Sequence, residues 1–225
     1  MTVLGLNSGT SADALDMAVV RISRTRGRIK VEPLAATEKR FSSELRRRIF
    51  KSTDSRTIDI NEIVYLDNLL GKTFGRLAAN YMKKLAGCGV RIDLVASHGQ
   101  TVRHLPRKIK YGGYWINGSL QLGSVDMIAA MTGVPVVGDF RQADIAIGNE
   151  GAPITVGAMR RLFACKKESR LIVNIGGMSN YFYFPWSESN LPVSAADCGP
   201  GNCLSDIIAD QLFSIRYDRG GRRAA

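Results

Sequence analysis

The fold is decided by the stretch Gly5-Leu6-Asn7-Ser8-Gly9-Thr10-Ser11-Ala12-Asp13-Ala14-Leu15-Asp16. It lies between two apolar runs, Val3 to Leu6 and Met17 to Val20, which are short or rich in valine and are therefore predicted strands. The small polar residues between them predict a hairpin whose backbone N–H groups and hydroxyls bind a polyphosphate. Asp13 and Asp16 can offer oxygen ligands to a Mg²⁺ on those phosphates. An ordinary tight turn uses the same residue types, so both interpretations stay open.

Length and composition indicate a globular protein. The chain has 225 residues, 45% of them hydrophobic, which is enough for one large or two small domains. No run approaches the ~18 apolar residues that span a bilayer, and no apolar leader precedes Asn7, so we expect a cytoplasmic protein without a membrane partner. Because the four cysteines include no Cys-x-x-Cys pair and only His98 and His104 can join them as metal ligands, we expect reduced structural thiols.

The net charge of +11 suits a nucleic-acid partner or an anionic substrate. The basic residues lie in two groups, Arg21 to Lys30 and Arg46 to Lys51, without the interleaved aromatics of a surface that binds nucleic-acid strands. A solvated basic face is the favoured explanation for them. We therefore expect no nucleic-acid partner.

The first half of the chain reads as an α/β unit. Its predicted elements are strands at Ile29–Ala36, Ile92–Ala96, Ser119–Leu122 and Val134–Val137, and helices at Glu44–Lys51, Ile58–Leu85 and Ser124–Met131. The strand Ile92–Ala96 should end in the polar cluster Ser97-His98-Gly99-Gln100-Thr101, followed by a basic insertion from Arg103 to Gly118. The carboxyl ends of such strands are where α/β proteins bind ligands.

The second half repeats the beginning. After a short helix ending at Phe163 and the charged stretch Lys166 to Arg170, an apolar strand runs from Leu171 into Gly176-Gly177. Two further strands, Asn180–Phe184 and Val193–Ala196, and a helix from Asn202 to Phe213 follow. Strand, strand, strand, helix thus occurs twice, and such internal repeats indicate duplicated architecture. The second copy stops after one helix.

A second polar turn, Asp197-Cys198-Gly199-Pro200-Gly201-Asn202, is predicted between the last strand and the last helix. An acid at such a junction can face a cleft, while the glycines let backbone approach a ligand. The alternative is a plain helix start, in which Asn202 caps the helix and the Gly-Pro-Gly run turns the chain.

Six motifs together resemble the anhydro-N-acetylmuramic acid kinase family. They are the opening turn, Ser97 to His104, Asp139-Phe140-Arg141, Gly151-Ala152-Pro153, Asn174-Ile175-Gly176-Gly177 and Asp197 to Asn202. The resemblance implies an actin/hexokinase/Hsp70-like fold of two ribonuclease H-like domains around an ATP cleft. We expect a complete first domain at residues 1–165 and an incomplete second domain at residues 166–225.

The resemblance also implies a reaction. The family hydrolyses the 1,6-anhydro bond of anhydro-N-acetylmuramic acid and transfers the ATP γ-phosphate to O6. Asp197 would be the general base that deprotonates the attacking water. ATP and Mg²⁺ would be the cofactors, with Asp13 and Asp16 near the metal. The implied phosphate-binding residues are Gly9, Thr10, Ser11, Ala12, Asp13, Asp16, Gly176 and Gly177, and the implied substrate contacts are His98, Gln100, Thr101, Arg141 and Asn202.

The chain departs from the family pattern in several places. Asn7 and Ala14 replace a usual Met and Gly in the opening turn, and Gln142-Ala143 replaces basic residues after Asp-Phe-Arg. Family members also continue beyond this point with an adenine pocket. We therefore expect an isolated chain that is inactive and that associates with a complementary C-terminal chain or with itself. A catalytically silent phosphate- or sugar-binding module is the alternative.

Overall fold

The computed structural model describes residues 1–9, 11–25, 28–54 and 57–224. They form two compact units, Met1–Gly151 (unit 1) and Ala152–Ala225 (unit 2). Among the described residues, no helix is both long and apolar enough to cross a membrane. All four cysteines are free; Cys88 and Cys198 are exposed, whereas Cys165 and Cys203 are partly buried.

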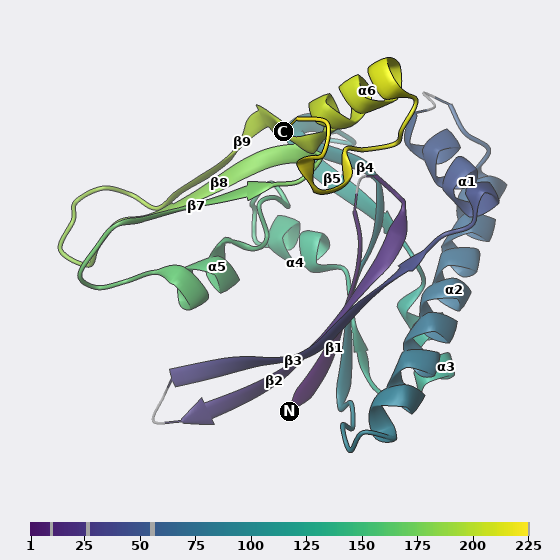
Figure 1. Ribbon diagram of the computed structural model, residues 1–225, viewed down its shortest axis with the longest axis horizontal. Helices are drawn as coiled ribbons and strands as arrows, with labels where there is room; N and C mark the ends of the chain where they lie inside the picture. The colour runs from purple at the N-terminus through teal and green to yellow at the C-terminus, as the bar shows by residue number, and fades with distance from the viewer. Residues whose placement is uncertain (10, 26–27, 55–56, 225) are drawn as a thin grey trace. The chain divides into compact units, whose positions relative to one another are not determined.

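Unit 1 is built on a mixed sheet (Figure 1). Its strands are β1 (Thr2–Ser8), β2 (Ala14–Thr25), β3 (Arg28–Arg40), β4 (Leu94–Tyr111), β5 (Tyr114–Leu122) and β6 (Val136–Val137). They lie in the order β3-β2-β1-β4-β5, and β6 also pairs with β4. The first three strands form an antiparallel meander, whereas β4 runs parallel to β1 and β6 runs parallel to β4. An antiparallel meander followed by parallel strands is the ribonuclease H-like arrangement that the resemblance implies.

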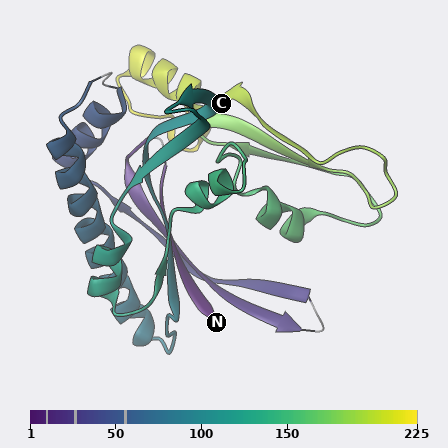
Figure 2. The ribbon, with the colours of Figure 1, turned by 180° about the vertical axis from the view of Figure 1, so that it is seen from behind.

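Helices cover both faces of this sheet. They are α1 (Ser43–Asp54), α2 (Ile60–Ala86), α3 (Val125–Thr132) and α4 (Phe140–Ala146). Figures 1 and 2 show α1, α2 and α3 on one face and α4 on the other. Leu66, Leu70 and Phe74 recur at helical spacing along α2 and are almost completely buried against the sheet. As predicted, the Ser124 hydroxyl caps α3 by accepting a hydrogen bond from the Met127 N–H (3.3 Å).

Three predictions for unit 1 were wrong in detail. Strand β4 does not end at Ala96 but continues to Tyr111, so the polar cluster lies inside a strand and the basic insertion is the β4–β5 hairpin. The strand continues because its pairing partner changes from β1 to β5 near Gln100, which keeps its backbone groups hydrogen-bonded. Only Val136–Val137 of the predicted strand Val134–Val137 pairs, and α4 was not predicted.

Unit 2 contains a smaller antiparallel sheet. Its elements are α5 (Val156–Phe163), β7 (Arg170–Ile175), β8 (Met178–Phe184), β9 (Ser194–Pro200), α6 (Asn202–Phe213) and the 3-10 turn η1 (Arg219–Gly221). The strands lie in the order β7-β8-β9. The sequence β7-β8-β9-α6 therefore repeats β1-β2-β3-α1, as the sequence predicts. Together the two units confirm the predicted α/β class.

The structure corrects two further details in unit 2. The division between the units falls after Gly151 rather than after residue 165, because α5 packs on β8 and so groups with the second sheet. Asn202 does not cap α6: Gly201 is the N-cap residue, and the Asn202 amide instead donates to the Ile175 carbonyl (3.2 Å).

Candidate functional site

Gln100 joins the opening turn to the polar cluster of β4. Its side-chain carbonyl accepts from the Ser8 hydroxyl (2.5 Å), and its amide nitrogen donates to the carbonyls of Gly9 (3.3 Å) and Thr101 (3.2 Å). Gln100 is 1% exposed and Ser8 is 2% exposed, so these bonds lie away from water. Two motifs separated by more than ninety positions in the chain thus meet at one buried amide.

The opening turn itself is closed tightly. The Ala12 N–H donates to the Gly9 carbonyl (3.1 Å), and Ala12 adopts a left-handed backbone conformation (φ 47°). Its methyl group is buried, whereas Ser11 is exposed. Thr10 lies outside the described residues.

The two aspartates of the turn have different surroundings. The Asp13 carboxylate forms an ion pair with the Arg46 guanidinium of α1 at 2.8 Å. Asp16 lies on β2 opposite Glu38 of β3, and the pKa of Asp16 is raised by partial burial and by the charge of Glu38. No cluster of three metal-binding side chains occurs in the part of the chain that the structure describes. Asp16 could offer a carboxylate oxygen to a Mg²⁺ that is bound mainly by phosphate oxygens.

A second contact joins three more motifs in unit 1. The Arg141 Nε donates to His98 Nε2 (3.2 Å), and its Nη1 donates to the Gly151 carbonyl (2.9 Å). His98 Nδ1 lies 3.1 Å from the Gly99 carbonyl. A neutral His98 with its proton on Nδ1 satisfies both contacts, because it donates to Gly99 and accepts from Arg141. The Arg141 guanidinium forms no ion pair within the described residues, so it can still receive an anion.

Burial and the charge of Arg141 favour the neutral form of both histidines. The pKa of His98 is lowered from 6.5, first by burial and then by the Arg141 charge, against a smaller opposing effect of the Gly99 carbonyl. The pKa of His104 is lowered for the same two reasons, with Glu150 opposing. Burial alone lowers the pKa of Arg141, which remains a cation at neutral pH.

Unit 1 should therefore lose stability in mild acid. As the pH falls through and below 6.5, the unfolded chain binds more protons at these histidines than the folded one, so the free energy of opening falls. Hydrogen exchange of the β1 and β4 amides at several pH values measures the free energy of opening. His98→Gln and His104→Gln should each make this free energy depend less on pH, and the double variant should reduce the pH dependence further. An unchanged slope in the double variant would contradict this account.

The β4–β5 hairpin contributes polar residues that the sequence did not single out. Gln121 donates to the Thr101 hydroxyl (3.3 Å) and to the Ser119 hydroxyl (2.6 Å). Ser119 also lies 3.1 Å from His104 Nδ1, and its carbonyl accepts from the Gln142 amide (2.6 Å). The available signal was the alternation of polar residues at 119 and 121, which places both on the face that Thr101 shares.

In unit 2, the Gly176-Gly177 turn is held against the start of α6. The N–H groups of Gly201 and Asn202 donate to the Gly177 and Gly176 carbonyls, both at 2.8 Å. Only glycine fits at position 201, because a Cβ there would lie 2.3 Å from the Gly176 carbonyl oxygen. The turn therefore directs its carbonyls to the start of α6.

Asp197 lies inside β9, exposed, opposite Asn180 of β8. Asn180 in turn lies opposite Asn174 of β7. Residues that pair directly across antiparallel strands share a face, so Asp197 ends a polar row that crosses all three strands. The sequence did not single out Asn180, although its position three residues after Gly177 was visible.

These motifs lie in a chain whose whole length matches one family. The family model for anhydro-N-acetylmuramic acid kinase matches residues 1–225. The chain belongs to the anhydro-N-acetylmuramic acid kinase family. A relative carrying the family's name in Salinibacter ruber is 35% identical over 223 residues, which cover 99% of this chain and 56% of the relative. One in Caldanaerobacter subterraneus is also 35% identical, over 99% of this chain and 57% of the relative.

The chain thus spans about half the length of the curated relatives of this kinase family that it matches. Among solved structures, YeaZ from Pseudomonas aeruginosa superposes with a TM-score of 0.24 at 13% identity, over 89% of this chain and 68% of that one.

Proposed function

We propose that this chain supplies the phosphate turns and the general base of a kinase that opens anhydro-N-acetylmuramic acid with water and phosphorylates O6, in cell-wall recycling in the cytoplasm. The observation that carries the proposal is the family match over all 225 residues, which includes every motif described above. The product would be N-acetylmuramate 6-phosphate.

The opening turn and the Gly176-Gly177 turn are the proposed phosphate sites for ATP. The first is held by Gln100 and the second by the start of α6, so both are prepared before ligand arrives. Phosphoryl transfer depends on such positioning and on charge stabilisation. Bound Mg²⁺ would neutralise phosphate charge, and we propose Asp16 as its protein ligand. Asp13 is committed to Arg46 and is a weaker candidate.

The proposed chemistry at the sugar uses Asp197, which takes a proton from the water that attacks C1. The C1–O6 bond breaks, and O6 accepts the γ-phosphoryl group as ADP leaves. Arg141, oriented by His98 and Gly151, would bind the carboxylate of the muramic acid. Thr101 would contact the sugar. Because the amides of Gln100 and Asn202 are already bonded to backbone carbonyls, we assign both to positioning rather than to the substrate.

Full activity would require the part of the relatives that this chain does not match. Leu171, Val173 and Ile175 on β7 are each more than half exposed, and so are Leu204, Ile207, Ile208 and Leu212 on α6. Apolar surface of this kind and an open strand edge favour association. We propose a complementary C-terminal segment as the partner, and self-association when that segment is absent.

An isotope experiment tests the reaction. The chain is completed with the C-terminal segment of the Salinibacter ruber relative and supplied with ATP labelled in its γ-phosphate, anhydro-sugar and ¹⁸O-water. The expected product carries the γ-phosphate on O6 and ¹⁸O on C1. Nucleotide and sugar binding without product would instead favour the catalytically silent module, and product without ¹⁸O at C1 would exclude Asp197 as the base for water.

Gln100→Leu should weaken ATP binding about tenfold, because it leaves the buried Ser8 hydroxyl without its acceptor and removes one donor from Gly9. Calorimetry with Mg-ATP measures the effect. Gln211→Leu, at an exposed position on α6, is the matched control.

The double variant Ser8→Ala, Gln100→Leu separates positioning from stability. It leaves neither buried side chain unsatisfied, so stability should recover while ATP affinity stays reduced. If both stability and ATP affinity recover in the double variant, Gln100 acts only on stability. If all variants bind ATP with equal affinity, Gln100 has no role in nucleotide binding.

A further inference from the structure

Unit 1 has a pocket outside the residues discussed above. It lies between the end of β3, the start of α1 and the middle of α2, and its volume is about 360 Å³. The lining residues are Arg40, Phe41, Ser42, Glu44, Leu45, Arg48, Leu69, Thr73, Arg76 and Leu77. This volume is in the range of small-molecule sites.

The pocket combines apolar walls with a cationic rim. Leu45 is buried, at 7% exposure, and belongs to the packed part of the wall. Leu69 is 42% exposed and offers apolar surface that a ligand can cover. Three arginines but only one carboxylate belong to the lining. Such a surface suits a molecule that has an apolar body and a negative group.

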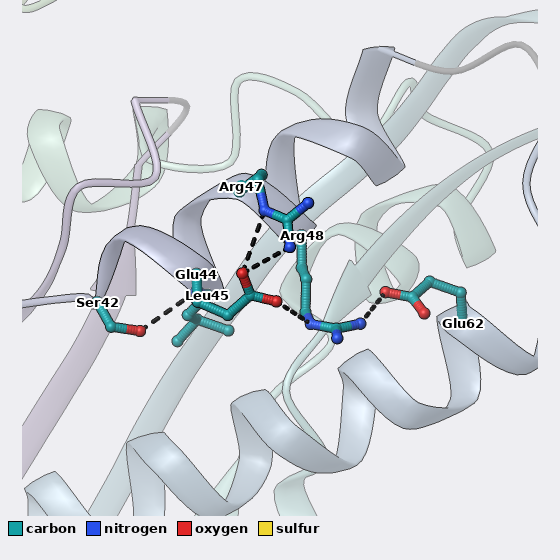
Figure 3. A network of polar contacts seen from close by, with 6 residues as sticks. All are labelled: Ser42, Glu44, Leu45, Arg47, Arg48 and Glu62. Carbon is teal, nitrogen blue, oxygen red and sulfur yellow. Dashed lines mark hydrogen bonds and ion pairs between the residues drawn. The ribbon is translucent and has the colours of Figure 1, made fainter.

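The single carboxylate is already neutralised within α1 (Figure 3). Glu44 accepts from Arg47 (2.6 Å) and from Arg48 (3.0 Å), and Arg48 also bonds to Glu62 of α2 (2.8 Å). The pKa of Glu44 is accordingly lowered, chiefly by the hydrogen bond from Arg47. Glu44 and Arg48 therefore hold one another and leave the anion-binding capacity of the pocket to the other two arginines.

Neither of those two arginines forms a close ion pair among the described residues. Arg40 approaches Glu38 only at 3.8 Å, on an exposed strand end. Arg76 forms no ion pair with any residue that the structure describes. Guanidinium groups in this condition can exchange their water for a phosphate or carboxylate, which they bind through paired N–H donors.

We propose that this pocket binds a small organic anion, with its phosphate or carboxylate group at Arg40 and Arg76 and its apolar body against Leu69 and Leu77. A second copy of the chain is a poor occupant, because each copy carries a net charge of +11 and the rim of the pocket is cationic.

The pocket is joined to the opening turn. The Phe41 N–H donates to the Asp13 carbonyl (2.9 Å), and Arg46 of α1 holds the Asp13 carboxylate. A ligand that shifts Phe41 or α1 therefore reaches the turn directly. If the turn binds nucleotide, as proposed above, the pocket is an effector site for ATP binding; this part rests on the proposed function.

Methyl NMR on the chain with labelled leucines tests the pocket itself. Phenyl phosphate carries both required groups, whereas benzyl alcohol lacks the charge and inorganic phosphate lacks the apolar body. Phenyl phosphate should shift the methyl resonances of Leu45, Leu69 and Leu77 at concentrations about tenfold lower than either control compound requires. Equal shifts with benzyl alcohol, or shifts confined to residues outside the pocket, would overturn the proposal.

Arg76→Gln should raise the dissociation constant of phenyl phosphate about tenfold, as loss of a charged hydrogen-bond donor does. Arg21→Gln, on β2 and outside the lining, should leave it unchanged. An unchanged constant in Arg76→Gln would overturn the site. Calorimetry then tests the effector role: phenyl phosphate should change ATP affinity in the original chain but not in Arg76→Gln. Failure to bind ATP at all would count against the proposed function, because the methyl shifts test the pocket separately.

Discussion

Asp197→Asn should lower kcat of the completed enzyme by at least about 10²-fold, the effect of losing a general base. The substitution keeps the size and polarity of the side chain but removes its ability to accept a proton at neutral pH. Asp197 is exposed on β9, at the end of the polar row through Asn180 and Asn174. Because it is proposed to act on water and not on ATP, the dissociation constant of Mg-ATP should stay unchanged.

Steady-state transfer of labelled phosphate and calorimetry with Mg-ATP measure the two quantities. Asp210→Asn, an exposed position on α6, is the matched control and should retain full turnover. If Asp197→Asn keeps the wild-type kcat, Asp197 is not the general base. If the variant loses ATP affinity and turnover to the same extent, Asp197 instead contacts the nucleotide.

The sequence predicted the order of elements well where the pattern was long and regular. The apolar spacing of Leu66, Leu70 and Phe74 defined α2, and the glycine turn at Gly176-Gly177 defined the β7–β8 hairpin. Both are local features, so neighbouring residues in the sequence were sufficient to specify them. The repeat of three strands and a helix was visible for the same reason.

Long-range pairing limited the rest. Nothing near Ser97 to Thr101 indicated that β4 would exchange partners and continue as a hairpin, because that depends on β5. The sequence singled out Gln100 as a candidate site residue, but it could not predict the hydrogen bonds of Gln100 to Ser8 and Gly9, since these residues come from another part of the chain. For the same reason, the sequence could not predict the ion pair between Arg46 and Asp13.

The polar row beside Asp197 shows the same limit. Asn174 and Asp197 belong to recognised motifs, whereas Asn180 is placed between them only by the register of β8. Similarly, Asn202 was a reasonable capping residue by type, but the close approach of Gly201 to the Gly176 carbonyl moves the cap by one residue.

Completion with the missing segment should convert an inactive chain into a kinase. The chain covers 56% of the Salinibacter ruber relative, and its second sheet leaves apolar residues of β7 and α6 exposed. Closure of a kinase around ATP excludes water and aligns the phosphate, so we expect the 225 residues alone to bind ATP loosely and transfer nothing.

The most direct measurement is transfer of labelled γ-phosphate to anhydro-N-acetylmuramic acid, by the 225 residues alone and after addition of the C-terminal segment. The account predicts no transfer above background for the chain alone, and turnover of roughly 1–100 s⁻¹ once the segment is added, as is usual for kinases. Sizing in parallel should show that the added segment forms a complex with the chain. Efficient transfer by a monomeric chain alone, or no transfer by the complex, would contradict it.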